Sequence, residues 1–420
     1  MSYYEIQGGR PLEGRLAIHG AKNSVLPILA AALLAPGESV IENCPRLSDV
    51  SATLDILRLL GCRVEWEADT VTVDASALSR CCVPECLMRE MRSSVIFLGA
   101  LLARVGEAEL FYPGGCELGP RPIDLHLAAL RTLGAEILEE QGSLCCRRGG
   151  KHPGSCEICL SIPSVGATEN AMLAACGREG TTTIVGAARE PEIVDLQNFL
   201  LAMGARVWGA GESVITVEGG VPLHPAHYRV MGDRMAAATY LCAAAAAGGQ
   251  VEIAAIDPNT LTAVLSCLSQ AGCRLHTEEG LIALEHRGPL SGIPPVRTAP
   301  YPGFPTDAQA VLMAALAGGR GSTMFVENMF ESRYGHVDEL RRMGAEIQID
   351  GRVAVVTGVG RLHGAALRGT DLRGAAALAV AALGAEGVST LTQLRHIRRG
   401  YEDFAGNLRR LGAEVREFTQ

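Results

Sequence analysis

Aromatic residues and long apolar stretches are both scarce in this sequence. Phe, Trp and Tyr make up 4% of its 420 residues, whereas 48% are hydrophobic and 49 are Gly. We therefore expect small and aliphatic side chains on closely packed helices, which favours helices against sheets. The longest apolar stretch near the N-terminus, residues 25–35, contains Pro27 and is shorter than the roughly 18 residues of a membrane span. A membrane protein is therefore not expected.

Blocks of basic residues are also missing. The net charge is −9, and no run of five or more Lys and Arg occurs, so we expect no nucleic-acid partner. A local basic cluster can still bind a small anion. The first five residues lack the basic segment and apolar run of a signal peptide, so we expect a cytoplasmic protein. The sequence identifies no protein partner.

Cysteine is abundant, with 14 residues. Without a secretory signal, a reducing compartment and buried free thiols are the expectation. Cys145, Cys146, Cys156 and Cys159 are an alternative set of zinc ligands. However, Cys156 and Cys159 fall in a strand-like run, whereas structural zinc sites usually place paired ligands on tight turns. We therefore predict no metal and no cofactor.

A helix end followed by a strand recurs six times, with its glycines 68 to 73 residues apart. An amphipathic helix precedes each glycine, which is expected to close the helix in the left-handed conformation. Alternating hydrophobic residues then predict a strand and a hairpin. The six occurrences are Leu60-Gly61-Cys62-Arg63-Val64, Leu133-Gly134-Ala135-Glu136-Ile137, Met203-Gly204-Ala205-Arg206-Val207, Ala271-Gly272-Cys273-Arg274-Leu275, Met343-Gly344-Ala345-Glu346-Ile347 and Leu411-Gly412-Ala413-Glu414-Val415.

Six repeats of this size predict two α/β domains of three repeats each. A solenoid is the alternative, although its repeats are usually only about 20 to 45 residues long. We expect a ligand cleft between two pseudo-symmetric halves, because ligand sites are common at domain interfaces.

Three polar segments are predicted to precede helices and to offer backbone N–H groups to anions. Residues 20–24 come before a helical run at 28–34, and residues 164–170 come before a run at 171–175. Residues 305–309 come before a run at 310–316. The alternative for each segment is helix capping alone, because Ser, Thr, Asn and Asp are common at helix starts.

Residues 112–126 form a loop of a different kind. Pro and Gly residues surround the thiol of Cys116 and the guanidinium of Arg121, which predicts an exposed, shaped loop. A thiol there can be activated by neighbouring cations, but Cys116 is alternatively one more inert cysteine. Four arginines are either surface charges or side chains whose guanidinium groups bind phosphate and carboxylate groups through two nitrogens. They are Arg92, Arg333, Arg373 and Arg399.

Six segments together resemble the UDP-N-acetylglucosamine 1-carboxyvinyltransferases. The resemblance extends along the whole chain, and the segments occur in the order found in that family. They are Gly20-Ala21-Lys22-Asn23, Gly114-Gly115-Cys116 with Gly119 to His126, Ser164 to Asn170, Glu190 to Asp195, Tyr301 to Asp307, and Arg399-Gly400-Tyr401-Glu402.

The resemblance implies an inside-out α/β barrel with two pseudo-symmetric domains, each of three repeats of about 70 residues. The first domain would comprise residues 22–230 and carry the catalytic loop, and the second would comprise residues 1–21 and 231–420. The implied reaction transfers the enolpyruvyl group of phosphoenolpyruvate to UDP-N-acetylglucosamine in peptidoglycan precursor synthesis. Those two small molecules are the partners we expect.

The resemblance also implies roles for individual residues. Cys116 would protonate the enolpyruvate, Asp307 would contact the attacking hydroxyl, and Lys22 and Arg399 would complete the catalytic set. The residues implied to hold the substrates are Lys22, Asn23, Arg92, Arg121, Pro122, Ile123, Asp124, Leu125, Ser164, Val165, Gly166, Asp307, Met329, Arg333, Asp371, Arg373 and Arg399.

Four positions depart from the family's usual residues: Ser48, Ile162, Ala236 and Arg398. Arg398 reverses the usual charge beside Arg399, which can shift the affinity for phosphoenolpyruvate. One alternative function is therefore a nucleotide-sugar-binding paralogue with impaired turnover. Transfer to shikimate 3-phosphate by the sister family is another, although that family is not expected to carry the Gly114-Gly115-Cys116 loop.

Overall fold

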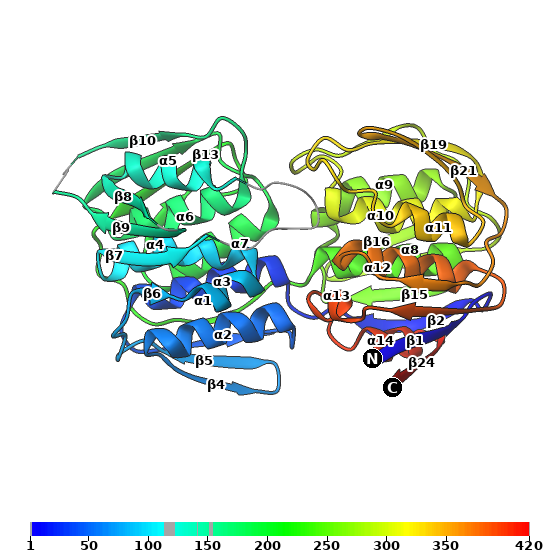
Figure 1. Ribbon diagram of the computed structural model, residues 1–420, viewed down its shortest axis with the longest axis horizontal. Coiled ribbons are helices and arrows are strands. Elements are labelled where there is room, and N and C mark those ends of the chain that lie inside the picture. Colours follow the sequence, from blue (N-terminus) through cyan, green and yellow to red (C-terminus); the bar gives the residue numbers. More distant parts are fainter. Residues whose placement is uncertain (1, 113–121, 141, 151–153, 420) are drawn as a thin grey trace. The chain divides into compact units, whose positions relative to one another are not determined.

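The computed structural model describes residues 2–112, 122–140, 142–150 and 154–419. Within these ranges the chain divides into two compact units (Figure 1). The first unit contains residues 20–112 and 122–231, and the second unit contains residues 2–19 and 232–419. Each unit has its own hydrophobic core. No helix among the described residues combines the length and apolar character needed to cross a bilayer.

Each unit holds three four-stranded sheets of one design. In every sheet an edge strand pairs in parallel with its neighbour, and the next two pairings are antiparallel. In the first unit the sheets are β14 (His227–Arg229), β3 (Glu38–Glu42), β5 (Thr70–Asp74) and β4 (Arg63–Glu67); β6 (Cys82–Val83), β7 (Glu107–Phe111), β9 (Ser143–Arg148) and β8 (Ala135–Glu140); and β10 (Cys156–Cys159), β11 (Gly180–Val185), β13 (Val214–Gly219) and β12 (Arg206–Trp208). In the second unit they are β2 (Leu12–Ala17), β15 (Gly249–Ala254), β17 (Leu281–His286) and β16 (Arg274–Glu278); β18 (Val296–Arg297), β19 (Arg320–Val326), β21 (Val353–Val359) and β20 (Glu346–Asp350); and β22 (Ala366–Arg368), β23 (Val388–Thr392), β1 (Ser2–Gln7) and β24 (Glu414–Thr419).

Strands that are distant in the sequence complete three of these sheets. β14, at the end of the first unit, pairs in parallel with β3 near its beginning. The N-terminal strands β1 and β2 join β23, β24 and β15, which lie far along the chain. The second unit is therefore assembled from both ends of the sequence.

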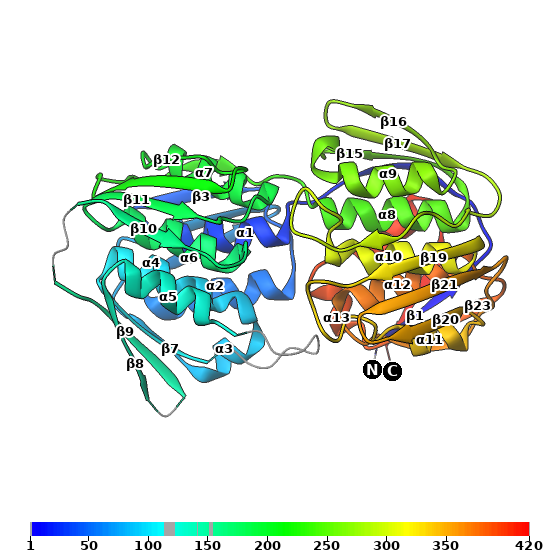
Figure 2. The same ribbon diagram turned by 90° about the horizontal axis from the view of Figure 1, so that it is seen from above.

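Buried helices lie inside each unit, and the sheets lie outside them (Figure 2). In the first unit these helices are α1 (Lys22–Ala31), continued by the 3-10 turn η1 (Ala32–Leu34), α4 (Phe97–Arg104) and α6 (Val165–Cys176); in the second unit they are α8 (Arg234–Ala247), α10 (Thr306–Ala317) and α12 (Leu372–Gly384). Residues 373–383 of α12 are all buried, as expected for a helix that is apolar on every side. Small side chains allow α8, α10 and α12 to pack against one another. The predicted inside-out α/β arrangement is confirmed, and the solenoid alternative is wrong.

A second set of helices ends one or two residues before the repeated glycines. They are α2 (Ser48–Leu60), α5 (Asp124–Thr132), α7 (Pro191–Ala202), α9 (Thr262–Gln270), α11 (Val337–Arg342) and α14 (Phe404–Arg410). The six glycines have φ between 86° and 106°, so the predicted left-handed closure is confirmed in every repeat. Short helices fill the connections: α3 (Glu85–Glu90), η2 (Arg92–Ile96), η3 (Pro258–Leu261) and α13 (Arg395–Arg398).

One backbone hydrogen bond recurs beside these glycines. In five repeats the carbonyl oxygen just before the glycine accepts an N–H from another segment at 2.9 to 3.0 Å. The donors are Ser79, His224, Ser291 and His363, which follow the hairpin of the same repeat, and Glu13, which comes from the N-terminus. In the second repeat the equivalent segment includes residues 151–153, which lie outside the described residues. The bond satisfies a carbonyl that a helix end leaves without an intrahelical donor.

Three helices begin earlier than predicted. α1 begins at Lys22, α6 at Val165 and α10 at Thr306, so the polar segments form first helical turns and do not precede the helices. The first turn of a helix has N–H groups without intrahelical partners, and polar residues are favourable there. A polar first turn and a polar loop have similar sequences, so the helix starts were predicted too late. Lys22, Val165, Gly166 and Asp307 therefore lie in the first turns of these helices.

The repeated glycines allow a test of the left-handed closure. Gly61 and Gly272 share a φ of 106°, so an alanine in either position is strained by about 1 to 2 kcal/mol. A Cβ at Gly61 would also lie 2.7 Å from the carbonyl oxygen of Ala77, whereas one at Gly272 meets nothing nearer than 3.8 Å. We therefore expect Gly61→Ala to lower the thermal unfolding midpoint of the first unit more than Gly272→Ala lowers that of the second. Equal shifts, or no shift with Gly272→Ala, would contradict this account.

Candidate active site

The amino ends of four buried helices carry eight of the predicted site residues. In the second unit, Asp307 lies in the first turn of α10, Asp371 is the N-cap of α12, and Arg373 is its second residue. In the first unit, Lys22 opens α1 and Ser164 is the N-cap of α6. Helix amino ends attract anions because their N–H groups point outward and the helix dipole is positive there.

Asp307 lies against two buried arginines. Its Oδ1 accepts from Nη2 of Arg333 at 2.8 Å, and its Oδ2 accepts from Nε and Nη2 of Arg373 at 3.2 and 3.0 Å. The arginine side chains are 2% and 3% exposed, whereas that of Asp307 is 30% exposed. Two adjacent positive charges favour the ionised carboxylate. Asp307 is therefore an oriented, accessible acceptor on a buried ion-pair cluster.

Asp371 extends this cluster. Its Oδ1 accepts from the backbone N–H groups of Arg373 and Gly374 at 3.0 and 3.1 Å, which caps α12. The same oxygen lies 3.9 Å from Nη1 of Arg333. The structure thus brings together four predicted residues that are distant in the sequence: Asp307, Arg333, Asp371 and Arg373.

Glu327 holds the neighbouring loop and was missed from the sequence. It is fully buried, and its carboxylate accepts from the hydroxyls of Thr298 and Thr306 at 3.0 and 2.9 Å. It also accepts from the N–H groups of Met329 and Phe330 at 2.7 and 3.1 Å. Four hydrogen bonds satisfy a carboxylate that would otherwise be costly to bury. Glu327 thereby ties the start of α10 to the loop that carries Met329, whose side chain is exposed.

Lys22 has a partner that the sequence did not reveal. Its Nζ lies 2.9 Å from Oδ2 of Asp49, with the two side chains 11% and 4% exposed. Asn23 is exposed. The next residue, Ser24, donates to the buried carboxylate of Asp195, and burial raises the pKa of Asp195 above its ordinary value although Ser24 lowers it. Contacts on both sides therefore orient the first turn of α1.

Gly166, Arg92 and Asp124, three of the predicted substrate-binding residues, lie near His126 of α5. Ser164 accepts from the N–H of Ala167 at 3.4 Å, and a Cβ at Gly166 would lie 2.8 Å from Cε1 of His126. The Oδ1 of Asn170 accepts from the N–H of Gly99, so its amide nitrogen faces Nδ1 of His126 at 2.7 Å. Nδ1 of His126 must therefore be an acceptor.

Arg92 and the start of α5 adjoin the same histidine. Nη2 of Arg92 donates to the carbonyl of Pro122 at 3.4 Å. Ile123 is buried, Asp124 is exposed, and Leu125 is half-buried. The pKa of His126 is lowered to about 4, mainly by burial and also by Arg92, while Asp124 opposes the change. Arg92 and Asp124 are therefore both near the His126 ring.

The remaining predicted residues include two that the structure does not describe. Cys116 and Arg121 lie outside the described residues. Arg399 is half-buried at the end of α13. Arg398 donates to Oε1 of Glu417 at 2.7 Å and to Oγ of Ser2 at 3.2 Å, so its charge is engaged with β24 and β1. Among the other departures, Ile162 is exposed, whereas Ala236 is buried in the first turn of α8.

The described residues include no group of three or more His, Cys, Asp and Glu that could hold a metal ion. Cys156 and Cys159 lie on β10, and Cys145 and Cys146 are consecutive on β9. Consecutive strand residues point to opposite faces of a sheet. This geometry gives no support to the alternative zinc site.

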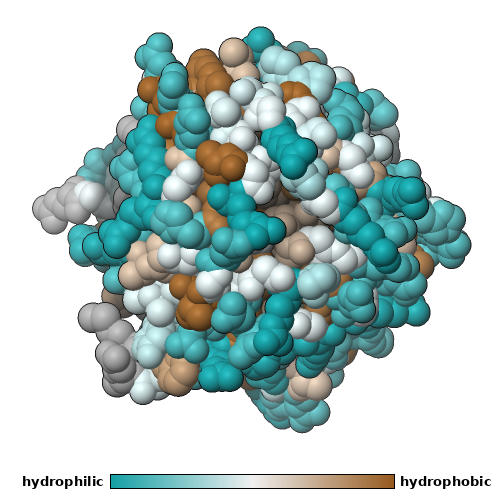
Figure 3. Space-filling model, turned by 90° about the vertical axis from the view of Figure 1, so that its right-hand side faces the viewer, coloured by the Kyte–Doolittle hydropathy of each residue, from teal (hydrophilic) through white to brown (hydrophobic). Residues whose placement is uncertain are grey.

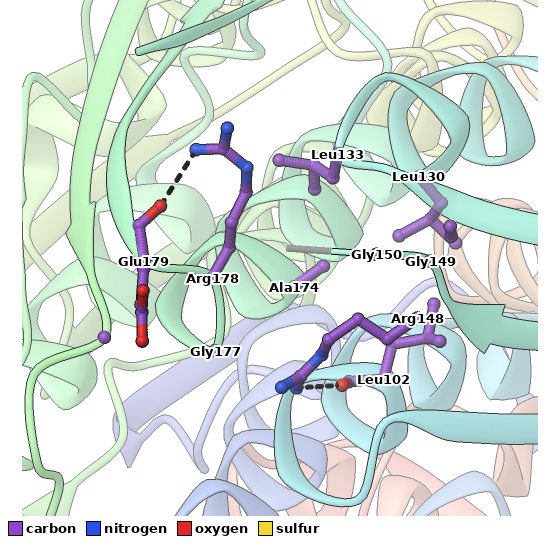
Figure 4. A pocket seen from close by; sticks show the side chains of 12 residues that line it. Leu102, Leu130, Leu133, Arg148, Gly149, Gly150, Ala174, Gly177, Arg178 and Glu179 are labelled. Carbon is purple, nitrogen blue, oxygen red and sulfur yellow. Dashed lines mark hydrogen bonds between the residues drawn. The ribbon is translucent and has the colours of Figure 1, made fainter. Parts of the chain in front are cut away.

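A cavity of about 270 Å³ lies elsewhere in the first unit, lined by Leu102, Leu130, Leu133, Arg148 and Arg178 among others (Figure 4). It lies at the carboxyl ends of α4, α5 and α6, whereas the predicted residues lie at the amino ends. Its arginines are engaged with backbone carbonyls: Arg148 donates to Ala103 at 2.7 Å, and Arg178 donates to Gly154 at 3.0 Å. The cavity therefore contributes nothing to the candidate site.

The depressed pKa of His126 predicts a pH-dependent loss of stability. The folded pKa of about 4 lies below the ordinary value of 6.5, so between these pH values the unfolded chain binds a proton that the folded chain does not. Stability is therefore lost as the pH falls from 6.5 towards 4, by at most about 3 kcal/mol. In His126→Gln, which keeps an acceptor for Asn170, we expect a weaker dependence in denaturant titrations at pH 7, 6 and 5. Parallel curves for the two proteins would contradict this assignment.

Comparisons with known proteins identify the family of this chain. The family model for EPSP synthase (3-phosphoshikimate 1-carboxyvinyltransferase) matches residues 6–408. A UDP-N-acetylglucosamine 1-carboxyvinyltransferase 2 from Caldanaerobacter subterraneus is 45% identical over 415 residues, covering 99% of both chains. A UDP-N-acetylglucosamine 1-carboxyvinyltransferase from Dichelobacter nodosus is 44% identical over 421 residues, covering 100% of both.

Solved structures share the fold over the whole chain. The enolpyruvyl transferase NikO from Streptomyces tendae has a TM-score of 0.87 at 28% identity, covering 100% of this chain and 99% of its own. An EPSP synthase from Acinetobacter baumannii has a TM-score of 0.79 at 22% identity, covering 100% of both, which is evidence for the fold alone. The chain therefore belongs to the EPSP synthase family, among its UDP-N-acetylglucosamine 1-carboxyvinyltransferases.

Proposed function

We propose that this protein transfers the enolpyruvyl group of phosphoenolpyruvate to the 3′-hydroxyl of UDP-N-acetylglucosamine and releases phosphate. The observation that carries this proposal is the accessible carboxylate of Asp307 on two buried arginines. Such a carboxylate can hold and orient a hydroxyl group in front of an anionic co-substrate. The names of relatives that are 44% and 45% identical over nearly the whole chain support the choice of substrates.

The reaction needs one group to receive a proton and another to supply one. As the sugar oxygen bonds to C2 of phosphoenolpyruvate, its proton passes towards Asp307, and Cys116 protonates the methylene carbon. Phosphate then leaves while the new methyl group loses a proton, which restores the double bond. Lys22, Arg121 and Arg399 would stabilise the phosphate, the carboxylate and the developing charge.

The first unit would supply much of the nucleotide-sugar site. Asn23 and Arg92, residues 121–125 and residues 164–166 would contact this substrate, and the open first turn of α6 suits an anionic group. Asp371, Arg373, Arg333 and Met329 of the second unit would complete the set. We propose that both units serve one pair of substrates.

This activity would commit UDP-N-acetylglucosamine to peptidoglycan precursors, and hence to cell-wall growth, cell shape and cell division. A cytoplasmic location agrees with both substrates. An epoxide phosphonate such as fosfomycin mimics phosphoenolpyruvate and would alkylate Cys116, since thiolates are strong nucleophiles.

The first test is phosphate release by the purified protein. We expect multiple turnovers only when phosphoenolpyruvate and UDP-N-acetylglucosamine are both present, and none with shikimate 3-phosphate. Cys116→Ser should lose at least about 100-fold in turnover, since positioned acids contribute roughly that much. Intact mass should show one fosfomycin adduct on the native protein and none on the variant. Release no faster than background with both substrates would refute the proposed function, and an adduct on another cysteine would refute the role of Cys116.

A second test concerns Asp49, the partner of Lys22. Asp49→Asn removes the charge that orients the Lys22 ammonium, so we expect the KM for phosphoenolpyruvate to rise about tenfold, equivalent to about 1.4 kcal/mol. Asp55→Asn is the matched control, because Asp55 lies on the same helix and pairs with Arg58 at 2.8 Å, but is 57% exposed. It should behave as the native protein does. Steady-state kinetics in which the two variants coincide would contradict a role for Asp49.

A further inference from the structure

Tyr401 contacts Arg373, one of the two arginines that bind Asp307. No role was predicted for Tyr401 from the sequence. It is 2% exposed, and its hydroxyl lies 3.1 Å from Nη1 of Arg373 and 2.8 Å from Oγ1 of Thr239. Oγ1 of Thr239 in turn lies 2.9 Å from the carbonyl oxygen of Met235. A continuous chain of hydrogen bonds thus runs from Asp307 through Arg373 into α8.

The direction of every bond in this chain is determined. A guanidinium only donates and a carbonyl only accepts, so Arg373 donates to Tyr401 and Thr239 donates to Met235. The remaining proton, on Tyr401, must then be donated to Thr239. Burial raises the pKa of Tyr401 above its ordinary value, although Arg373 opposes the change, so the hydroxyl keeps this proton. Tyr401 therefore always presents a lone pair to Arg373.

This lone pair holds the side of the guanidinium that Asp307 does not contact. Arg373 uses Nε and Nη2 for Asp307 and Nη1 for Tyr401, so partners on both sides oppose its rotation. We propose that Tyr401 is a positioning residue for the enolpyruvyl transfer, which keeps the Arg373 fork aligned with the Asp307 carboxylate. The inference rests on the proposed function, because it assumes that Asp307 orients the attacking hydroxyl.

The same chain of hydrogen bonds links the three buried helices of the second unit. Thr239 and Met235 belong to α8, Asp307 to α10 and Arg373 to α12. Small displacements of reacting groups are expensive, since a misplacement of about 1 Å can cost roughly 100-fold in rate. A hydroxyl that locks these helix ends together can therefore affect turnover without touching a substrate.

Tyr240 is a matched control within the same unit. It is fully buried, and its hydroxyl accepts from Nδ2 of Asn407 at 3.2 Å. Both rings pack near Phe404, with centroid distances of 5.9 Å for Tyr240 and 5.1 Å for Tyr401. Changing either tyrosine to Phe removes one buried hydroxyl from the same aromatic cluster. The Tyr401 variant also keeps the ring that lies 5.5 Å from the Arg373 guanidinium.

The experiment compares Tyr401→Phe, Tyr240→Phe, Thr239→Val and Thr239→Ser. We expect kcat to fall about tenfold in Tyr401→Phe, equivalent to about 1.4 kcal/mol, while both KM values change less than about twofold. Thr239→Val leaves the Tyr401 proton without an acceptor and should lower kcat similarly, whereas Thr239→Ser keeps the hydroxyl and should restore it. Tyr240→Phe should have a similar thermal midpoint to Tyr401→Phe but nearly native kcat. Equal kcat in the two Phe variants, at equal stability, would overturn the inference.

A structural measurement separates this inference from the proposed function. Crystal structures of the two Phe variants should show Arg373 displaced from its two-nitrogen contact with Asp307 in Tyr401→Phe only. An undisturbed Arg373 would overturn the positioning role whether or not the native protein turns over. Failure of the native protein to release phosphate would instead refute the proposed function, and leaves the crystallographic comparison as a valid test of the link between Tyr401 and Arg373.

Discussion

The buried side chains of Arg333 and Arg373 connect the amino ends of α10 and α12 in the second unit. Taking a guanidinium out of water costs several kcal/mol unless opposite charges and hydrogen-bond acceptors surround it. Here Asp307 and Asp371 supply the charge, and Tyr401 supplies a further acceptor. Among these four charged residues two cations face two anions, and Asp233 adds a further negative charge near Arg373. The attraction for an anionic substrate must then come from the helix amino ends and from other cations. Asp307 would act mainly by orienting the substrate hydroxyl.

The architecture explains why polar groups accumulate at these ends. The sheets lie outside and the apolar helices lie inside each unit, so most of the length of a central helix cannot accommodate charge. At its amino end, N–H groups without intrahelical partners need acceptors, and Asp371, Asp233 and Ser164 provide them as N-caps. On the face of the second unit in Figure 3, hydrophobic residues lie in small separate groups among hydrophilic ones. That face does not present one broad apolar surface.

The conformation of short segments could be predicted from the sequence. The side-chain partners that lie far apart in the sequence could not. The left-handed glycines were predictable because glycine adopts positive φ without strain and recurs at a regular interval. The starts of α1, α6 and α10 were misjudged because a polar first turn resembles a loop in the sequence. Asp49 and Glu327 were missed because their partners lie 27 residues away for Asp49, and as far as 29 residues away for Glu327. No local pattern records such partners.

Arg398 shows why neighbours in sequence are poor guides to neighbours in space. Its position beside Arg399 suggested that a reversed charge would act on the substrate site, and this was the main argument for impaired turnover. However, α13 is a single short helical turn, and adjacent residues on a helix point about 100° apart. The guanidinium of Arg398 is bonded to Glu417, and both side chains are partly exposed, at 54% and 38%. A paired charge in contact with water acts weakly at a distance, so this substitution gives little reason to expect a weakened transferase.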